Sequence, residues 1–176
     1  MYERLRLPDG LAEMPPGPEL ARVLAELDRS QLNGHDLVTV ARARTRLAAW
    51  AQGELLADLA EIAHCPAGGP DASPTRTPQV QEYAADEIAY ALRWTRRAAE
   101  TQLGLALDVV SRHPALHAAM CAGELDLAKA RVITDAVTVL DPPTGDRVIA
   151  RVLPVVGEVT TGALRARLAR LVIAED

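Results

Sequence analysis

Residues 37–64, LVTVARARTRLAAWAQGELLADLAEIAH, decide the fold class of this chain. Apolar side chains recur every three or four positions along them, which is the spacing of one face of an α-helix. These residues are Leu37, Val40, Ala41, Leu47, Ala48, Ala51, Leu55, Leu59 and Ile62. The spacing predicts a helix of about 28 residues, about 40 Å long. We expect so long a helix to act either as a spine against which the later helices pack or as one half of a dimer interface.

The composition also favours helices packed on helices. The chain has 176 residues, enough for one domain with a sizeable core. Aromatic residues make up only 3% and phenylalanine is missing, so the core must consist of Leu, Val, Ile and the abundant Ala. The same scarcity removes the stacking platforms of a single-strand nucleic-acid binder. We therefore expect an all-α, multi-helix bundle.

Proline and glycine divide the chain into four segments within one structural domain. We expect an irregular lead-in over residues 1–18, a helical hairpin with the long helix over 19–64, a Pro/Gly-rich loop over 65–78, and a helical region over 79–176. Asn33 is a good cap for the long helix, and Thr77 with Pro78 has the pattern of another helix start. Further helix starts are expected at Pro114, Asp126, Asp141 and Thr161.

Residues 86–107, DEIAYALRWTRRAAETQLGLAL, have the pattern of a helix-turn-helix. The first helix would turn Ile88 and Leu92 inward, and Thr95 would cap the second. Trp94 would fill the corner between them. The inner face of the second helix would carry Ala99, Leu103, Ala106, Leu107 and Val110.

Two interpretations of this corner remain open. A helix-turn-helix that reads DNA presents the first turn of its second helix to the major groove, where arginine pairs with guanine. The residues expected to contact DNA are then Arg93, Thr95, Arg96, Arg97 and Thr101. A purely structural corner is the alternative, because the segment has no net charge and Arg93 stands where such turns often have glycine.

The charge of the chain restricts any DNA contact to a local patch. Asp and Glu number 24 against 19 Lys and Arg, giving a formal charge of −5, whereas DNA binders usually carry a basic excess. The long helix has Arg42, Arg44 and Arg46 in its first half and acidic residues in its second half, at Glu54, Asp58 and Glu61. This pattern indicates a solvated face that pairs with neighbouring helices, or an arginine cluster that touches phosphates.

The residues predict neither catalysis nor a bound metal. Cys65 and Cys121 are the only cysteines, which indicates a reduced, cytoplasmic setting. His113, His117 and Cys121 would follow one helix face, but Pro114 places His113 at a cap and no carboxylate is evident beside them. Phosphate-binding glycine loops, serine elbows and HExxH are missing, so we expect no cofactor and no small-molecule substrate. No apolar run has the length of a membrane span.

Three stretches resemble the actinobacterial domain of unknown function 222. They are LNGHDLVTVARARTRLAAWAQGELLADLAEI, EYAADEIAYALRWTRRAAETQLGLALDVVSRHPALHAAMCAGELDLAKARVITDAVTVLD and RVLPVVGEVTTGALRARLARLVIAED. The resemblance covers about residues 19–176, and the order of EIAYAL, AAE and AGELDLAKARVI is its most specific part. In that family the helical region usually precedes an HNH nuclease domain. No segment of this chain matches the nuclease pattern, so none of its catalytic residues can be assigned here.

The resemblance implies a setting of DNA transactions. Our first expectation is a noncatalytic helical module that targets or positions an HNH nuclease on double-stranded DNA. Such a nuclease would follow Asp176 in a longer protein, or this form would lack it. The alternative is an oligomerisation or protein-interaction scaffold, a homodimer through the Leu37–Ile62 helix with no direct DNA contact.

Overall fold

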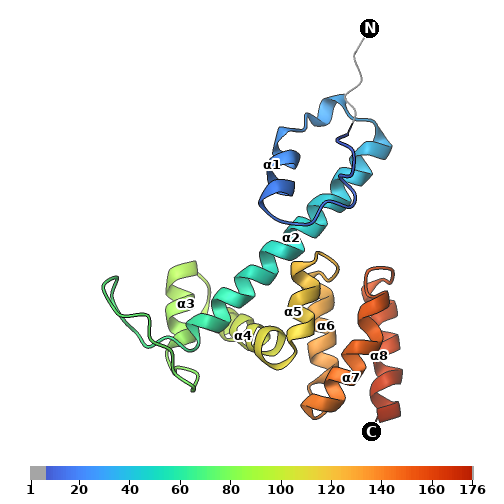
Figure 1. Ribbon diagram of the computed structural model, residues 1–176. Helices are drawn as coiled ribbons and strands as arrows, with labels where there is room; N and C mark the ends of the chain where they lie inside the picture. The colour runs from blue at the N-terminus through green and yellow to red at the C-terminus, as the bar shows by residue number, and fades with distance from the viewer. Residues whose placement is uncertain (1–6, 176) are drawn as a thin grey trace.

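The computed structural model describes residues 7–175 and shows eight α-helices with no β-strand among them (Figure 1). The all-α prediction is therefore confirmed. The helices are α1 (Pro18–Glu26), α2 (Gly34–Ile62), α3 (Ala84–Leu92), α4 (Arg96–Ala106), α5 (Pro114–Cys121), α6 (Leu127–Val137), α7 (Pro142–Val152) and α8 (Thr161–Glu175). Within the described part of the chain, no helix combines the length and the apolar character that crossing a bilayer requires.

The long helix is present as predicted and connects two separate hydrophobic cores. Helix α2 has 29 residues, and the Asn33 side chain caps it by accepting a hydrogen bond from the Asp36 backbone N–H at 2.9 Å. Figure 1 shows α2 running from an N-terminal lobe built with α1 to the body formed by the later helices. One face of α2 is buried in a separate core in each half of the helix, so α2 is the spine of the fold.

The N-terminal lobe covers the first half of α2. Arg46 donates hydrogen bonds to the carbonyls of Ala12 and Met14, and Arg44 donates one to the Leu24 carbonyl at 2.8 Å. Two members of the predicted arginine cluster therefore hold this lobe in place, while Arg42 stays exposed. The lobe's own core consists of Leu11, Leu20, Val23, Leu24, Leu32, Val40 and Ala43. Residues 1–6 of the expected lead-in lie outside the described residues.

The main body consists of α3–α8 and the second half of α2, with α3 packed on α4 and α7 packed on α8. Helices α4 and α5 lie on α2, and α6 packs against α8. The largest side chains that this packing buries completely are Leu56, Leu59, Ile88, Leu116, Met120, Leu125, Ile133, Ile149, Leu164 and Leu168. The core is thus aliphatic, as the composition predicted.

The loop after α2 extends further than the sequence indicated. Helix α3 begins at Ala84, so the helix start predicted at Thr77 and Pro78 is wrong. The Thr77 backbone N–H donates to the His64 carbonyl at 2.8 Å, and its hydroxyl donates to the carbonyls of His64 and Gln79 instead of capping a helix. These bonds tie the segment back to the end of α2 and keep it from starting a helix.

A π-helical turn at Leu107–Arg112 follows α4 and shifts which side chains are buried. The His113 backbone N–H bonds to the Asp108 carbonyl five residues back, at 2.8 Å. Because a π-turn holds more residues than an α-turn, the buried face rotates after Ala106. Ala99, Leu103 and Ala106 are buried as predicted, but within the π-turn Val109 is buried and the predicted Leu107 and Val110 are only half-buried.

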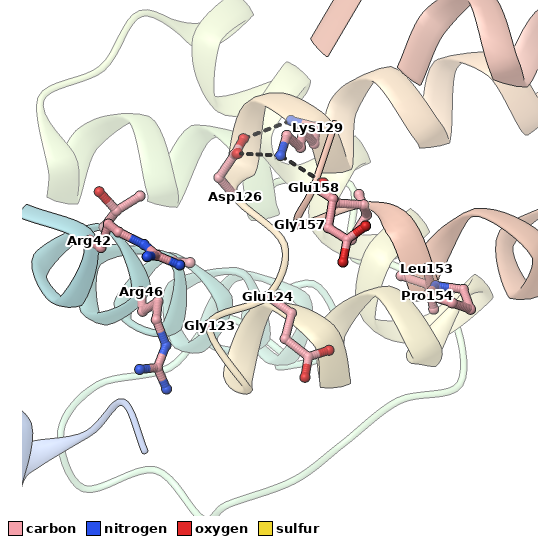
Figure 2. A pocket seen from close by; sticks show the side chains of 13 residues that line it. Arg42, Arg46, Gly123, Glu124, Asp126, Lys129, Leu153, Pro154, Gly157 and Glu158 are labelled. Atoms are coloured by element: carbon pink, nitrogen blue, oxygen red, sulfur yellow. Dashed lines mark hydrogen bonds and ion pairs between the residues drawn. The ribbon is translucent and has the colours of Figure 1, made fainter. Parts of the chain in front are cut away.

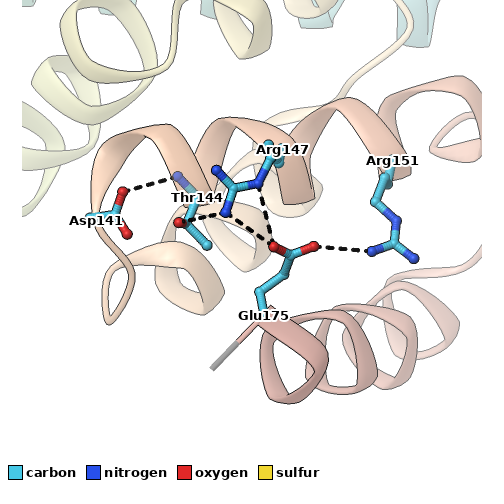
Figure 3. Close-up of polar contacts among 5 residues, drawn as sticks. All are labelled: Asp141, Thr144, Arg147, Arg151 and Glu175. Carbon is cyan, nitrogen blue, oxygen red and sulfur yellow. Dashed lines mark hydrogen bonds and ion pairs between the residues drawn. The ribbon is translucent and has the colours of Figure 1, made fainter.

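Helices α7 and α8 are joined by a charged cluster that Figure 3 shows. The Glu175 carboxylate lies 3.2 Å from the guanidinium of Arg147 and 3.3 Å from that of Arg151. Asp141 caps α7 as expected, because it accepts a hydrogen bond from the Thr144 backbone N–H at 3.1 Å. Helix α8 is capped one residue earlier than predicted, by the Thr160 hydroxyl and not by Thr161.

Candidate functional site

The predicted helix-turn-helix corner is present between α3 and α4. Arg93 ends α3 in the left-handed conformation, with φ 56° and ψ 35°, and the Trp94 N–H donates to the Ala89 carbonyl at 3.0 Å. Arg93 therefore adopts the conformation for which such turns often use glycine. The Thr95 side chain caps α4 by accepting a hydrogen bond from the Ala98 N–H at 3.2 Å. Trp94 is half-buried against the main core, as a corner filler should be.

One residue of the corner does not lie as predicted. Ile88 is buried, but Leu92 is 41% exposed. Leu92 is the last residue of α3 before the left-handed turn, and there it lines a groove of about 370 Å³ beside α2. Leu55 and Ile62 from α2 line the same groove, so an apolar strip of α2 and α3 stays open to solvent.

The three predicted arginines are all exposed at the corner. The Arg93 guanidinium lies 5.2 Å from the centre of the Tyr90 ring, a cation–π contact. Arg96 lies 3.0 Å from Glu100 and 3.4 Å from Asp86. Arg97 is exposed and forms no ion pair with any residue in the described range. The arginines are thus accessible to a ligand.

The two predicted threonines form hydrogen bonds within α4 instead. The Thr95 hydroxyl accepts the capping hydrogen bond, and the Thr101 hydroxyl donates to the Arg97 carbonyl one turn earlier, at 2.8 Å. Both side chains are exposed, yet each already has a partner on its own helix. A ligand at this corner would therefore meet the arginines first.

The histidines and the cysteine near α5 separate into two groups. His113 is only 3% exposed, and its Nδ1 lies 2.7 Å from an oxygen of Asp146 on α7. His117 and Cys121 face α2 instead, where Glu54 joins them. Burial is the main cause that raises the pKa of the Cys121 thiol, followed by its hydrogen bond to Glu54. No local sequence pattern links this carboxylate to α5, because Glu54 is far away along the chain.

A cleft of about 620 Å³ lies where the turns between later helices meet α2 (Figure 2). Lys129 crosses one side of it and donates to the Val156 carbonyl at 2.7 Å, which ties α6 to the turn before α8. Arg42, Glu124 and Glu158 also line the cleft, so charges of both signs surround it. Its lining contains no histidine or cysteine from residues 7–175. Because charges of both signs line it, the cleft offers no uniform charge for an ionic ligand.

Together these features define an all-α protein built on one long helix, with a helix-turn-helix corner at its side. Comparison of the chain with protein-family models, with curated proteins and with solved structures finds no match. The function is therefore inferred from the residues and their geometry.

Proposed function

We propose that this chain is a noncatalytic helical module that binds double-stranded DNA through the α3–α4 corner. Following the resemblance noted in its sequence, its task would be to position an HNH nuclease on the DNA. The observation that carries the proposal is the exposed corner itself, where Arg96 and Arg97 begin α4 and Arg93 forms the left-handed turn just before it. This is the part of a helix-turn-helix that enters the major groove.

Two local effects support DNA binding by a chain that is acidic overall. The N-terminal end of α4 carries the positive end of the helix dipole, which attracts phosphate. The pairs that Arg96 forms with Asp86 and Glu100 are exposed, and exposed ion pairs contribute only about 0–1 kcal/mol. Phosphate groups can therefore replace these carboxylates at little cost.

The proposal is tested by fluorescence anisotropy with labelled duplex DNA across a salt series. Each phosphate contact contributes about 0.9 to the slope of log affinity against log salt. We expect the Arg96→Ala/Arg97→Ala double variant to bind more weakly and to reduce that slope by about 1–2 units. Failure of the wild-type chain to bind at low salt contradicts the proposal.

A matched control separates the corner from general charge. Arg165 and Arg167 are exposed on α8, at the far side of the body from α3 (Figure 1). The Arg165→Ala/Arg167→Ala variant removes the same charge and should leave affinity and slope close to wild type. Equal losses in both double variants would mean that the corner is not the DNA-binding surface.

Self-association through α2 is a second candidate, favoured by an exposed apolar stripe. Leu37 and Leu55 are 38% and 39% exposed, and the exposed residues Ala41, Ala48 and Ala51 lie between them. These five residues occupy the a and d positions of a heptad repeat, the seam of a coiled coil. In an antiparallel pair, the exposed Arg42 of one α2 would face the acidic second half of the other, so a second copy is the occupant that fits.

Light scattering tests the second candidate at tens of micromolar protein. We expect a dimer for wild type and a monomer for Ala48→Glu, because a buried unpaired carboxylate opposes association. Val139→Glu is the matched control, since Val139 is 78% exposed and lies outside α2. A strictly monomeric wild-type chain, or a dimer that survives Ala48→Glu, refutes self-association through this stripe.

A further inference from the structure

We propose that Glu54, His117 and Cys121 form a binding site for Zn²⁺ between α2 and α5. Glu54 comes from the second half of α2, and His117 and Cys121 lie one turn apart on α5. Their potential ligand atoms all lie within 4.8 Å of one another. A carboxylate, an imidazole and a thiol are the three side-chain types that bind zinc in proteins.

The distances already approach those of a tetrahedral zinc complex. Cys121 Sγ lies 3.4 Å from His117 Nε2 and 3.5 Å from Glu54 Oε1. With Zn–S of about 2.3 Å and Zn–N or Zn–O of about 2.0–2.2 Å, ligand atoms of a tetrahedron are about 3.5 Å apart. The two distances from Cys121 Sγ therefore already match a tetrahedral site, and the ligand atoms of His117 and Glu54 lie within 4.8 Å of each other.

The packing of α2 against α5 places the ligands in advance. Gly53 precedes Glu54, and a Cβ at Gly53 would lie 3.2 Å from Met120 Cβ and 3.4 Å from Cys121 Sγ. The missing side chain lets α5 approach α2 closely at the position where Cys121 meets Glu54. Because Met120 is completely buried, the α5 backbone is fixed here by the core.

The ligand set determines the metal and the chemistry of binding. A thiolate with imidazole favours zinc over the hard cations Mg²⁺ and Ca²⁺. In the metal-free protein the Cys121 thiol donates its proton to Glu54, so zinc binding replaces this proton and releases it to solvent. The thiolate and the carboxylate then neutralise the ion. Glu54 is exposed and the other two ligands are half-buried, which gives the ion a route from solvent and leaves a fourth position for water.

The site has a different role from the proposed DNA contact. A zinc ion here would cross-link two helices whose contact belongs to the main core, so it would stabilise the body without touching the α3–α4 corner. Failure of the zinc proposal leaves the DNA proposal intact, and the reverse also holds.

Titration of the full chain with Co²⁺, followed by competition with Zn²⁺, tests the site. We expect one equivalent of Co²⁺ to produce a thiolate-to-cobalt charge-transfer band and intense visible bands of a four-coordinate ion, both abolished by Zn²⁺. Cys121→Ser should lose the charge-transfer band. Glu54→Gln removes an exposed ligand with little risk to folding and should weaken metal binding at least about 100-fold. Loss of a residue that only hydrogen-bonds to a metal ligand costs about 10–100-fold, so the larger loss identifies Glu54 as a ligand.

The second cysteine is the matched control. Cys65 is half-buried and its thiol donates to the Glu61 carbonyl, away from the cluster. Cys65→Ser should keep both spectrum and affinity. In a thermal melt, Zn²⁺ should raise the midpoint of wild type and Cys65→Ser but not of Cys121→Ser. Absence of stoichiometric Co²⁺ uptake, or a charge-transfer band that survives Cys121→Ser, overturns the proposal.

Discussion

Replacing Gly123 with alanine should destabilise the protein strongly, because the position combines an unfavourable backbone conformation with a close contact. Gly123 follows α5 with φ +75°, and its Cβ would lie 2.9 Å from Arg46 Cβ and 3.1 Å from the Arg46 carbonyl oxygen on α2. A left-handed non-glycine residue costs about 1–2 kcal/mol. Overpacking adds about 1–3 kcal/mol, because the backbone of a long helix cannot move aside. The lower entropy of the unfolded alanine chain offsets about 0.4–1 kcal/mol.

The expected net loss for Gly123→Ala is therefore about 3 kcal/mol in the free energy of unfolding. Chemical denaturation followed by circular dichroism measures it, and a thermal melt should show a fall of about 6–12 °C for a chain of this length. Two other glycines separate the contributions. Gly10 has φ +76° with nothing within 4 Å, so Gly10→Ala should cost about 1 kcal/mol. Gly104 lies open within α4, and Gly104→Ala should stabilise by about 1 kcal/mol.

The difference between Gly123→Ala and Gly10→Ala isolates the contact with Arg46. We expect about 2 kcal/mol for this difference. Equal losses at the two positions would refute the reasoning, because the close approach of the α5–α6 turn to α2 would then contribute nothing.

Three further outcomes follow from single contacts. Arg93→Gly should be more stable than Arg93→Ala by about 1 kcal/mol in chemical denaturation, because both variants lose the contact with Tyr90 but only alanine keeps the left-handed strain; equal stabilities would contradict this. Asp146→Ala should cost about 1–3 kcal/mol, since it leaves the buried His113 ring without its acceptor, and Asp146→Asn should cost less. Hydrogen bonds from Thr144, first that of its side chain, lower the pKa of Asp141. A carboxyl group whose pKa is lowered in the folded state stabilises the folded protein at pH values above its ordinary pKa, and this contribution is lost as the carboxylate protonates. The difference in unfolding free energy between wild type and Asp141→Ala should therefore be complete at pH 7 and shrink below about pH 4. A difference independent of pH would contradict this.

Local signals in the sequence were enough to predict most of the helices. The period of the apolar residues and the cap at Asn33 placed α2 to within a few residues, because both depend on neighbours along the chain. Asp126 and Asp141 also cap the helices that they were expected to begin. Errors arose where a local pattern competed with a tertiary contact. Thr77 and Pro78 have the pattern of a helix start, but the bonds of Thr77 to the end of α2 prevent a helix there.

The two candidate sites differ in the same way, because one depends on neighbours along the chain and the other on tertiary contacts. The arginines at the α3–α4 corner are consecutive or nearly so, and their shared exposure follows from one turn of helix. The residues of the proposed zinc site come from helices that are separated by more than one loop, and no periodicity along the chain brings Glu54 to Cys121. One local signal was available, namely the isolated Gly53 inside a long helix, which often marks a close approach of another backbone. The π-turn after Ala106 has no comparable signal, and for this reason the faces of Leu107 and Val110 were misplaced.

Two glycines allow the close approach of α2 to α5 and to the turn that follows α5. Gly53 removes a side chain from α2 beside Cys121, and Gly123 removes one from the turn after α5 beside Arg46. Beside the buried Met120, polar side chains line the solvent-facing edges of this contact. On one side these groups are Glu54, His117 and Cys121, and on the other they line the cleft that contains Lys129. The α2–α5 contact therefore both supports the main core and sets the geometry of the proposed zinc site.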